Sequence, residues 1–373
     1  MNPRAREPLP DALRAAALAG VLLVNAVSYL DAPWGPLLGE TRPEGHAGTL
    51  LLQGLIASFV QGKAYPLLAF LFGVGLALAW RKHRAAGVDP HQAARRRQWK
   101  LLALGVAHGL LLYFGDILTM YALAGLLVLG HVDAPWQRLR RLLRRALVWA
   151  IGATTAGLVL MALSLRWPED GGAAAQRLAD MATMPEWLAL NASAYLWGQV
   201  GAAIFFLPVL RLCMLAGIAA ARLRWLHHRR WRTAHRRIVQ RAGVPVLLLN
   251  LGYAAAMMLA AQRAPQGRTS WWVEGFSPLV GLPMAAVILS LAAIHAANHP
   301  QGDWNRLVPL GRRTLSCYLG HSLACAVLFS ALAIGWRPDT AQLVVFALAL
   351  WVTLVVVAGK AGRPWWPERW LAR

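Results

Sequence analysis

Long apolar runs separated by short polar clusters repeat along the whole chain. Ten of these runs are long enough to cross the roughly 30 Å hydrocarbon core of a bilayer as helices. They lie at residues 11–29, 63–80, 99–114, 117–131, 146–165, 200–221, 243–261, 276–297, 314–335 and 339–359. The third and fourth runs are separated by a turn at Gly115 and Asp116, which predicts a tight helical hairpin. The pattern predicts an all-α, polytopic integral membrane protein with about ten transmembrane helices, in a single domain over residues 1–373.

The composition supports a membrane protein and argues against a soluble one. Hydrophobic residues make up 58% of the chain, charged residues only 14%, and the mean hydropathy is +0.45. A soluble domain of this length does not have such a composition. The net charge of +22 would suggest a nucleic-acid partner on a soluble fold, but the cations fall in short clusters between apolar runs. We therefore expect membrane lipids as partners, and no nucleic acid.

Lys and Arg are distributed very unequally between the two sides of the predicted spans. The side that holds both termini and the loop 222–242 carries 30 of the 38 cations, whereas the opposite side carries 6. By the positive-inside rule, both termini are predicted to be cytoplasmic. The first apolar run is too long for the core of a signal peptide, so we expect a retained helix. Segments 48–60 and 187–199 are too short or too polar to cross alone and are interpreted as interfacial.

Three cysteines, Cys213, Cys317 and Cys325, lie inside apolar runs without metal-ligand spacing. We interpret them as buried thiols that pack as small hydrophobic residues, and no metal site is predicted.

The first predicted helix carries Arg14 near its cytoplasmic end and Asn25 eleven positions later. Eleven residues make almost three helical turns, so both side chains lie on one face, about 16 Å apart. Arg14 fits a topology anchor whose side chain reaches the headgroups, or a contact for an anionic substrate. Asn25 fits either an interhelical hydrogen bond or a catalytic contact.

The predicted hairpin, "VAHGLLLYFGDILTMYALAG", contains His108, Asp116 and Tyr121. An ionisable group in hydrocarbon costs roughly 2.5–3.5 kcal/mol on insertion scales, so each one needs a partner or a function. Asp116 fits a cap for the following helix, and His108 fits either a structural hydrogen bond or a general base. On a straight helix the two lie about 12 Å apart, which favours a relay through water or Tyr121 over direct contact. We expect them to line a polar cavity that opens outward, with Tyr121 and Lys63 on its wall.

Four further polar positions fall inside or beside predicted spans. Lys63 lies at an external boundary, where it fits a partner for Asp116 or a contact for an anionic substrate. Arg211 is deeper and must face protein or water. In "GRRTLSCYLGHSLACAVLF", Ser316 fits a helix cap, and His321 fits a structural hydrogen bond or a substrate contact. The small residues that follow Lys63, including Gly73, favour close helix packing.

Four segments occur in an order that resembles the YeiB-like bacterial membrane proteins, whose shared region is catalogued as domain of unknown function 418. They read "DALRAAALAGVLLVN", "QGKAYPLLAFLFGVGLAL", "AHGLLLYFGDILTMYALAG" and "GRRTLSCYLGHSL". The resemblance covers nearly the whole chain, with a C-terminal family-like portion at about 200–373, and implies the bacterial inner membrane. The ending "GRPWWPERWL", around Glu368, departs from the Gly-Pro-x-Glu-Trp pattern of that family, and His321 stands where Gln is commoner.

The first helix is also similar to that of the wider transmembrane acyltransferase group, which includes acyltransferase family 3 and heparan glucosaminide acetyltransferase. Acyltransferase family 3 members have an Arg, ten residues and then a catalytic His, and the same spacing here gives Arg14 and Asn25. The heparan type also has Asn at that place and takes its His from the following external loop. In this chain the only His of that loop is His46, about ten residues further along. The similarity implies an acyl-CoA donor, with no resident cofactor.

Two functions therefore stay open, besides a non-catalytic assembly or stress-related membrane protein. The first is an acyl transferase that moves an acyl group from a cytoplasmic acyl-CoA to an envelope glycan or lipid, with His108 as base, Asp116 as its partner and Asn25 at the thioester oxygen. Substrate contacts would come from Arg14, Lys63, Tyr121, Arg211, Ser316 and His321. The alternative is a transporter or flippase for a small or lipidic anion, in which Lys63, Arg211 and Asp116 line a path. The sequence leaves the oligomeric state open.

Overall fold

A computed structural model describes residues 8–30, 47–164, 183–263, 273, 275–300, 302–329, 333–336, 338–363 and 365–372. Within these ranges the chain forms helices joined by short turns. They are α1 (Pro8–Leu30), α3 (Ala47–Phe59), α4 (Ala64–Ala85), α5 (Pro90–Leu111), α6 (Leu118–Val128), η1 (Leu129–His131), α7 (Trp136–Ser164), α9 (Met184–Leu223), η2 (Arg229–Trp231), α10 (Arg232–Arg263), α12 (Ser277–Asn298), η3 (Asp303–Leu307), α13 (Val308–Gly311), α14 (Thr314–Phe329), α15 (Thr340–Lys360) and α16 (Trp366–Ala372).

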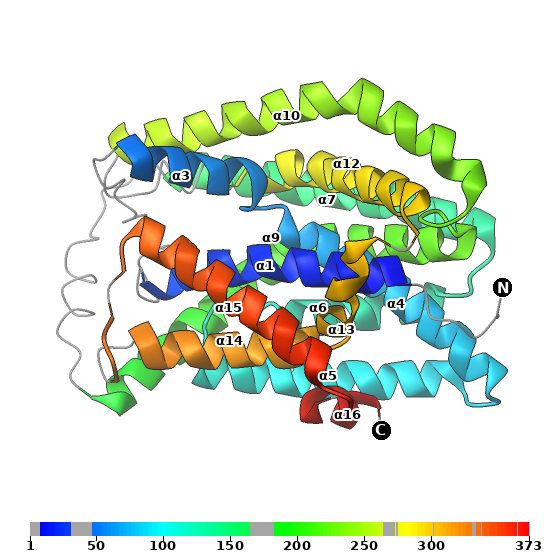
Figure 1. Ribbon diagram of the computed structural model, residues 1–373, viewed down its shortest axis with the longest axis horizontal. Coiled ribbons are helices and arrows are strands. Elements are labelled where there is room, and N and C mark those ends of the chain that lie inside the picture. Colours follow the sequence, from blue (N-terminus) through cyan, green and yellow to red (C-terminus); the bar gives the residue numbers. More distant parts are fainter. Residues whose placement is uncertain are drawn as a thin grey trace.

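The long helices lie side by side in one bundle, roughly parallel or antiparallel to one another (Figure 1). The first residues of α1 and the last helix, α16, lie toward the right of Figure 1. This end also carries the turns that follow α4 and α9, with basic residues such as Lys82, Arg84 and Arg224. We call it the basic end. The charge asymmetry along the sequence thus becomes a charge asymmetry between the two ends of the bundle.

Within the described ranges, seven helical segments are long and apolar enough to cross a membrane. They are Pro8–Ala26, Leu51–Ala85, Trp136–Leu163, Met184–Leu223, Arg229–Ala260, Ser277–Asn298 and Thr340–Lys360. Two shorter apolar helices, Leu118–His131 and Thr314–Phe329, coincide with predicted spans as well. The structure therefore confirms an all-α protein with several membrane-spanning helices, whereas the count of about ten stays a prediction.

Two helix starts show how local sequence sets an element. Asp89 precedes α5, and its carboxylate accepts the backbone N–H of His91 at 2.9 Å, with Pro90 in the first helical position. Asp339 does the same for α15 by accepting the N–H of Gln342 at 2.8 Å. Both residues satisfy a helix N-terminus that would otherwise lack acceptors for its first N–H groups.

The central crossing of α4 and α9 depends on two glycines. A Cβ at Gly73 would lie 2.1 Å from the carbonyl oxygen of Met214, and one at Gly217 would lie 2.0 Å from that of Phe70. The backbones therefore touch, and the predicted role of Gly73 in close helix packing is confirmed. Phe70 and Met214 are part of the main hydrophobic core.

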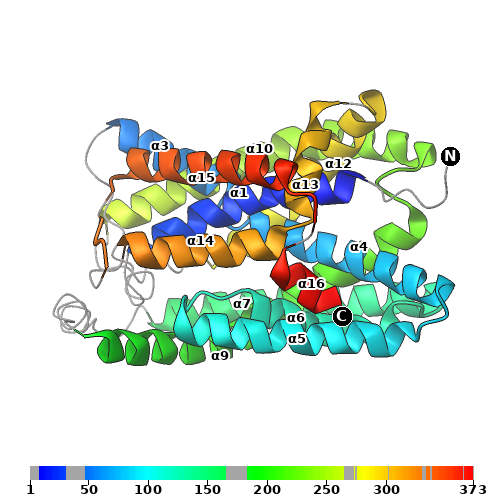
Figure 2. The ribbon, with the colours of Figure 1, turned by 60° about the horizontal axis from the view of Figure 1, so that its bottom comes forward.

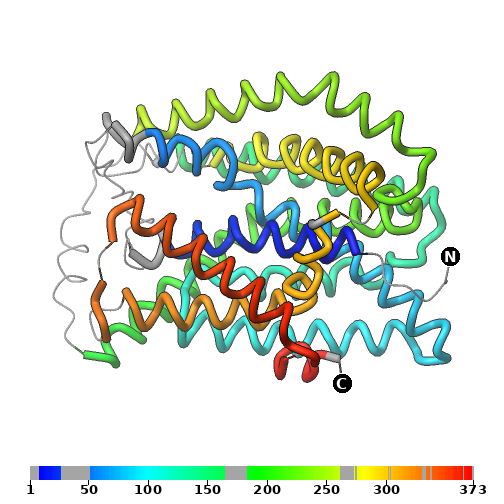
Figure 3. The backbone as a smooth tube through the Cα atoms, viewed as in Figure 1, coloured from blue at the N-terminus to red at the C-terminus, as the bar shows by residue number. Residues whose placement is uncertain are grey.

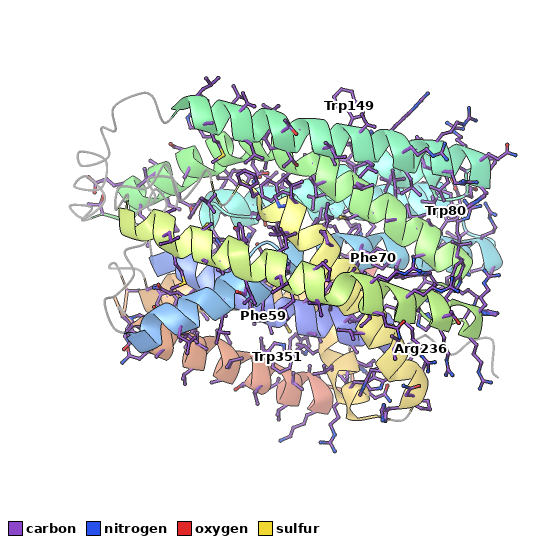
Figure 4. The ribbon with its side chains drawn as sticks, turned by 90° about the horizontal axis from the view of Figure 1, so that it is seen from above. Phe59, Phe70, Trp80, Trp149, Arg236 and Trp351 are labelled. Atoms are coloured by element: carbon purple, nitrogen blue, oxygen red, sulfur yellow. The ribbon has the colours of Figure 1, made fainter. Side chains whose placement is uncertain are left out.

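Lipid-facing and interior side chains separate clearly across the bundle. Figure 4 shows Trp149 on the outer side of α7, where 67% of the residue is exposed. The three cysteines are free and buried, as predicted from their apolar surroundings.

Figure 3 shows α10 bowed along its length, and Pro245 lies inside this helix. A proline removes one backbone hydrogen bond and is a common cause of such a bend.

The two segments interpreted as interfacial behave differently. Residues 187–199 are the first part of the continuous 40-residue helix α9, so their interpretation as a separate interfacial segment is wrong. Their polar side chains are accommodated because they bind neighbouring backbone groups, as described below. Residues 48–60 coincide with α3, which lies along α10 (Figure 1). The chain then breaks at Gly62, whose φ of 76° is left-handed, and continues as α4.

Candidate functional site

His108 and Asp116 form a direct buried pair. The Nδ1 atom of His108 lies 2.9 Å from Oδ1 of Asp116, and only 3% and 4% of these residues are exposed. The contact arises because α5 ends at Leu111, several residues earlier than predicted, and the chain folds back before α6. The prediction of a 12 Å separation bridged by water or Tyr121 is therefore wrong.

Asp116 also caps α6. Its Oδ2 atom accepts the backbone N–H of Thr119 at 2.8 Å, so the predicted capping contact is present. Each carboxylate oxygen thus serves a different partner, and the same residue orients His108 and starts the next helix. Because a carboxylate only accepts hydrogen bonds, the contact favours the His108 tautomer with a proton on Nδ1.

The other ring nitrogen of His108 is the chemically open position. Nε2 is buried and has no hydrogen-bond partner within the described ranges. Leaving a buried polar atom unpaired costs about 1–3 kcal/mol, so such an atom in a native site requires an explanation. A deprotonated Nε2 held by a carboxylate on the opposite nitrogen has the arrangement of a general base.

Three residues of α9 hold the hairpin that carries this pair. Asn191, Tyr195 and Gln199 are spaced four residues apart, so they lie on one face of the helix. The amide of Asn191 donates to the carbonyl oxygens of Gly109 and Leu110, both at 2.9 Å.

The same face of α9 also contacts the turn and the start of α6. The side-chain oxygen of Asn191 accepts the N–H of Phe114 at 2.9 Å, and the Tyr195 hydroxyl lies 2.9 Å from Oγ1 of Thr119. Gln199 donates to the backbone carbonyl of Asp116 at 3.3 Å. These three residues are not among the site residues predicted from the sequence, because the segment that carries them is interpreted there as interfacial. The available signal was the four-residue spacing of polar side chains in an otherwise apolar helix.

A cavity of about 2520 Å³ enters the bundle from the basic end. Nine cationic side chains line it: Arg14, Arg81, Lys82, Arg95, Arg96, Arg97, Lys100, Arg224 and Arg312. Three carboxylates, Asp11, Asp89 and Glu368, are present as well, so the wall is strongly positive. This cavity opens at the basic end. The predicted polar cavity would open at the opposite, external end, so this is a different cavity.

The deep end of the cavity reaches the neighbourhood of the His108–Asp116 pair. Leu118, Tyr121 and Tyr318 line this end, so Tyr121 faces the basic cavity and not the predicted cavity that opens outward. His108 is not among the lining residues, but its ring centre is 5.0 Å from that of Tyr318. One aromatic ring therefore separates the cavity from the histidine.

Arg14 is held rigidly on the cavity wall. Its Nη1 atom lies 2.7 Å from Oδ1 of Asp11, and its Nη2 atom donates to the carbonyl oxygen of Leu71 at 2.7 Å. Asp11 is 1% exposed and also contacts Arg312, whose Nε is 3.4 Å away. Gly75 makes room for this arrangement, because a Cβ there would lie 2.4 Å from Nη2 of Arg14. Arg14 thus faces the cavity as part of a fixed charge cluster.

Arg97 lies in the same cavity, and no neutralising partner contacts it among the residues that the structure describes. Its guanidinium is 5.2 Å from the ring centre of Phe72 and close enough to Arg14 for the two positive charges to repel. Within the described ranges no carboxylate forms an ion pair with it. Two neighbouring guanidiniums in a confined space favour an anionic ligand, because a ligand charge would relieve the repulsion.

Lys63 belongs neither to the His108–Asp116 pair nor to the wall of the basic cavity. It is buried, donates to the carbonyl oxygen of Ala57 at 2.6 Å, and lies 4.9 Å from the ring centre of Tyr253. The cation therefore sits at the C-terminal end of α3, where the helix dipole favours positive charge. The predicted contact with Asp116 is wrong, and Lys63 is not on the wall of the basic cavity.

The remaining predicted residues are dispersed. Arg211 lies on α9 near His131, with a buried Nε that has no partner within the described ranges, and it does not line the basic cavity. Tyr121 donates its hydroxyl proton to the carbonyl oxygen of Tyr65 at 2.8 Å. Asn25 is buried in α1, and its Nδ2 lacks a partner in the described part of the chain. His46 lies outside the described residues.

Two positions on α14 have structural partners. Ser316 donates its hydroxyl to Glu368, whose carboxylate also accepts the Ser316 backbone N–H at 2.9 Å. Glu368 thereby caps the start of α14, the role expected of Ser316 itself. His321 bonds the backbone of Leu22 and lies 3.4 Å from the sulfur of Cys325. These contacts agree with the structural interpretation of His321.

Comparison with known proteins supports a membrane protein and shows which sequences this chain is similar to. The chain is a membrane protein with several apolar spanning helices. Residues 220–370 match the family described as "Protein of unknown function (DUF418)". The chain is also similar to the uncharacterized protein YeiB of Escherichia coli (strain K12), with 26% identity over 93% of this chain and 89% of that protein. The resemblance to the YeiB-like family is therefore confirmed.

Two Bacillus proteins are similar over shorter regions. The uncharacterized protein YxaH of Bacillus subtilis (strain 168) is 31% identical over 38% of this chain and 34% of that protein. The uncharacterized 39.9 kDa protein in the amylase 3' region of Bacillus acidopullulyticus is 34% identical over 32% of each chain. The aligned region thus spans about a third of each of these two relatives. No solved structure matches the chain. The similarity to the acyltransferase group stays a prediction.

Proposed function

We propose that this protein is a bacterial inner-membrane acyl transferase that uses a cytoplasmic acyl-CoA as donor. The observation that carries the proposal is a cavity lined by nine cations that ends one aromatic ring from a buried His–Asp pair with an unpaired Nε2. The acceptor would be a hydroxyl or amine of an envelope glycan or lipid. About ten spans, with the basic end and both termini in the cytoplasm, complete the proposed topology.

The donor would bind with its phosphates at the cationic wall. Arg14 and Arg97 present two guanidiniums inside the cavity, and guanidinium groups bind phosphate oxygens through paired hydrogen bonds. The pantetheine arm would extend toward Leu118, Tyr121 and Tyr318, which places the thioester near the deep end. Tyr318 must move aside for the thioester to reach His108.

The reaction requires one base that later acts as an acid. In our proposal Nε2 of His108 takes the proton of the acceptor while the acceptor oxygen or nitrogen attacks the thioester carbonyl. Asp116 stabilises the imidazolium that forms, because its carboxylate already holds Nδ1. The C–S bond then breaks, and the leaving sulfur takes the proton from Nε2. In this proposal Asn25 is the candidate donor to the oxyanion on one observation, a buried Nδ2 with no partner within the described residues.

The alternative, a transporter or flippase for an anion, retains one supporting observation. The basic cavity would also attract a small or lipidic anion that is never covalently changed. However, Lys63 and Arg211 do not line this cavity, so the three residues expected along a transport path are not brought together.

The decisive experiment uses the full chain in nanodiscs of phosphatidylcholine. We expect CoA and acetyl-CoA to bind, and acetyl-CoA to be hydrolysed slowly with water as acceptor, measured as released thiol. His108→Gln should bind CoA normally but lose thiol release. His235→Gln is the matched control, because His235 is equally buried and bonded to Ser290 and the backbone of Trp225, away from the cavity.

Several results would contradict the proposal or one of its parts. If neither CoA nor acetyl-CoA binds at millimolar concentration, the donor assignment fails. If His108→Gln releases thiol as fast as the unsubstituted protein, with equal thermal stability, the base assignment fails. Anion counterflow in proteoliposomes without covalent change would favour the transporter instead. Reporter fusions that place the loop between α9 and α10 outside the cytoplasm would contradict the topology.

A further inference from the structure

An apolar groove of about 610 Å³ runs along the outer face of α5. Its lining residues are Trp99, Leu102, Ala103, Val106, Ala107, Leu110 and Leu111. They follow the spacing of one helix face, and all are apolar. Ala103 and Ala107 are one turn apart, so their small side chains leave a furrow between larger neighbours. The ends of the groove are open to the membrane, since Trp99 and Leu111 are 56% and 58% exposed.

The groove joins the basic cavity. Trp99 and Ala103 line both, so the cavity reaches the outer face of α5 at this level. Figure 2 shows α16 between α5 and α14, beside the middle of α5, and α16 contacts both helices. Lys100 holds α16 there by donating to the backbone oxygen of Trp370 at 2.9 Å. The wall of the cavity that faces the membrane is therefore a short helix and a few side chains, with the groove just beyond it.

The groove has the length of a membrane acyl chain. From Trp99 to Leu111 the helix rises about 18 Å. One leaflet of the hydrocarbon core is about 15 Å deep, half of the whole core. A fatty acyl chain lying in the groove would thus be covered on one side by protein over its full length.

The deep end of the cavity offers no comparable space for a chain. Leu118, Tyr121 and Tyr318 close it, and His108 behind them is 3% exposed. A ligand whose reactive carbonyl lies at this end must direct any long substituent sideways. The sideways route leads past Ala103 into the groove.

We propose that the donor is a long-chain acyl-CoA whose alkyl chain leaves the cavity past Trp99 and Ala103 and lies along α5. The proposal rests on the proposed function. It adds the class of acyl group, because a cationic cavity continuous with an apolar groove matches an anionic head joined to an alkyl tail. Such a donor already keeps its chain in the cytoplasmic leaflet, so a lateral route spares the chain a transfer into water.

The test compares the binding of CoA, acetyl-CoA and palmitoyl-CoA to the full chain in phosphatidylcholine nanodiscs, with empty nanodiscs subtracted. We expect palmitoyl-CoA to bind at least about tenfold more tightly than CoA, a difference of about 1.4 kcal/mol. Ala107→Trp fills the groove without touching the cavity, since Ala107 lines only the groove. In this variant palmitoyl-CoA should bind less than about twofold more tightly than CoA, a difference of less than about 0.5 kcal/mol. The affinity for CoA itself should be unchanged.

Controls separate this proposal from simpler explanations. Val148→Trp places the same ring on the lipid-facing side of α7, where Val148 is 70% exposed, and should change nothing. The long-chain proposal is overturned, and the proposed function stands, if palmitoyl-CoA binds no more tightly than CoA. The same holds if Ala107→Trp and Val148→Trp have equal effects on the affinity for palmitoyl-CoA. If phosphatidic acid competes as well as palmitoyl-CoA, the groove is a lipid site and the proposal is overturned as well. If no CoA species binds, the proposed function itself fails.

Discussion

Replacing Asp116 with Asn tests whether one side chain serves both His108 and the start of α6. The carboxylate accepts from two donors at once, Nδ1 of His108 at 2.9 Å and the Thr119 N–H at 2.8 Å. An amide has one acceptor oxygen and one donating nitrogen. If the amide turns its NH₂ group toward the Thr119 N–H, two donors meet. If it turns the NH₂ group toward His108, the ring must take the tautomer with its proton on Nε2, which has no partner within the described residues. One buried donor is then unpaired, at a cost of about 1–3 kcal/mol.

Asp116→Ala removes both contacts, so the cost of the lost cap, about 0.5–2 kcal/mol, is added to that of the unpaired histidine nitrogen. The matched control is Asp339, whose carboxylate accepts a single N–H, that of Gln342, at the start of α15. Asn and Asp are equivalent caps at such a position, so Asp339→Asn should be nearly neutral and Asp339→Ala should cost about 1 kcal/mol.

The measurement is the free energy of unfolding by SDS titration in mixed micelles, followed by tryptophan fluorescence or circular dichroism. We expect Asp116→Asn to lose at least 1 kcal/mol more than Asp339→Asn, following the cost of about 1–3 kcal/mol for an unpaired buried donor. Equal and negligible effects of the two substitutions would show that Asp116 does not bridge both donors in the membrane.

Three further predictions concern packing and charge. Gly73→Ala should lower the free energy of unfolding by about 1–3 kcal/mol or more in the same titration, because the new Cβ would meet the backbone of Met214. Gly252→Ala on α10 is the control: its Cβ would enter open space, so the free energy of unfolding should stay the same or rise. Arg97→Met should weaken CoA binding about tenfold or more, as expected when a charge-assisted contact worth about 1.5–3 kcal/mol is lost, and Arg236→Met, outside the cavity, should not. Equal effects of the two Arg substitutions would refute the assignment of Arg97 to the anion site. Lys63→Met should lower stability but leave CoA binding unchanged, and weaker CoA binding would show that Lys63 reaches the donor.

The sequence alone determined the features that depend on neighbouring residues along the chain. Apolar runs and their length predicted an all-α membrane bundle, and the positions of α1, α12 and α15 follow from them. The clustering of Lys and Arg predicted that one end of the bundle would be basic. Asp116 was recognised as a helix cap because a cap and its partner N–H are only three residues apart.

Tertiary structure decided which of the polar residues meet. His108 contacts Asp116 only because α5 ends at Leu111, and residues of α9 hold that end by binding its free backbone groups. No local pattern in the hairpin carries this information, since α9 begins more than 70 residues later. Likewise, Lys63 binds the end of α3 and not Asp116, and cations from α1, α4, α5 and α9 join in one cavity. Such contacts depend on how helices pack, and inside a membrane this packing is set by the shapes of facing side chains and by interhelical hydrogen bonds, which the apolar pattern along the chain does not specify.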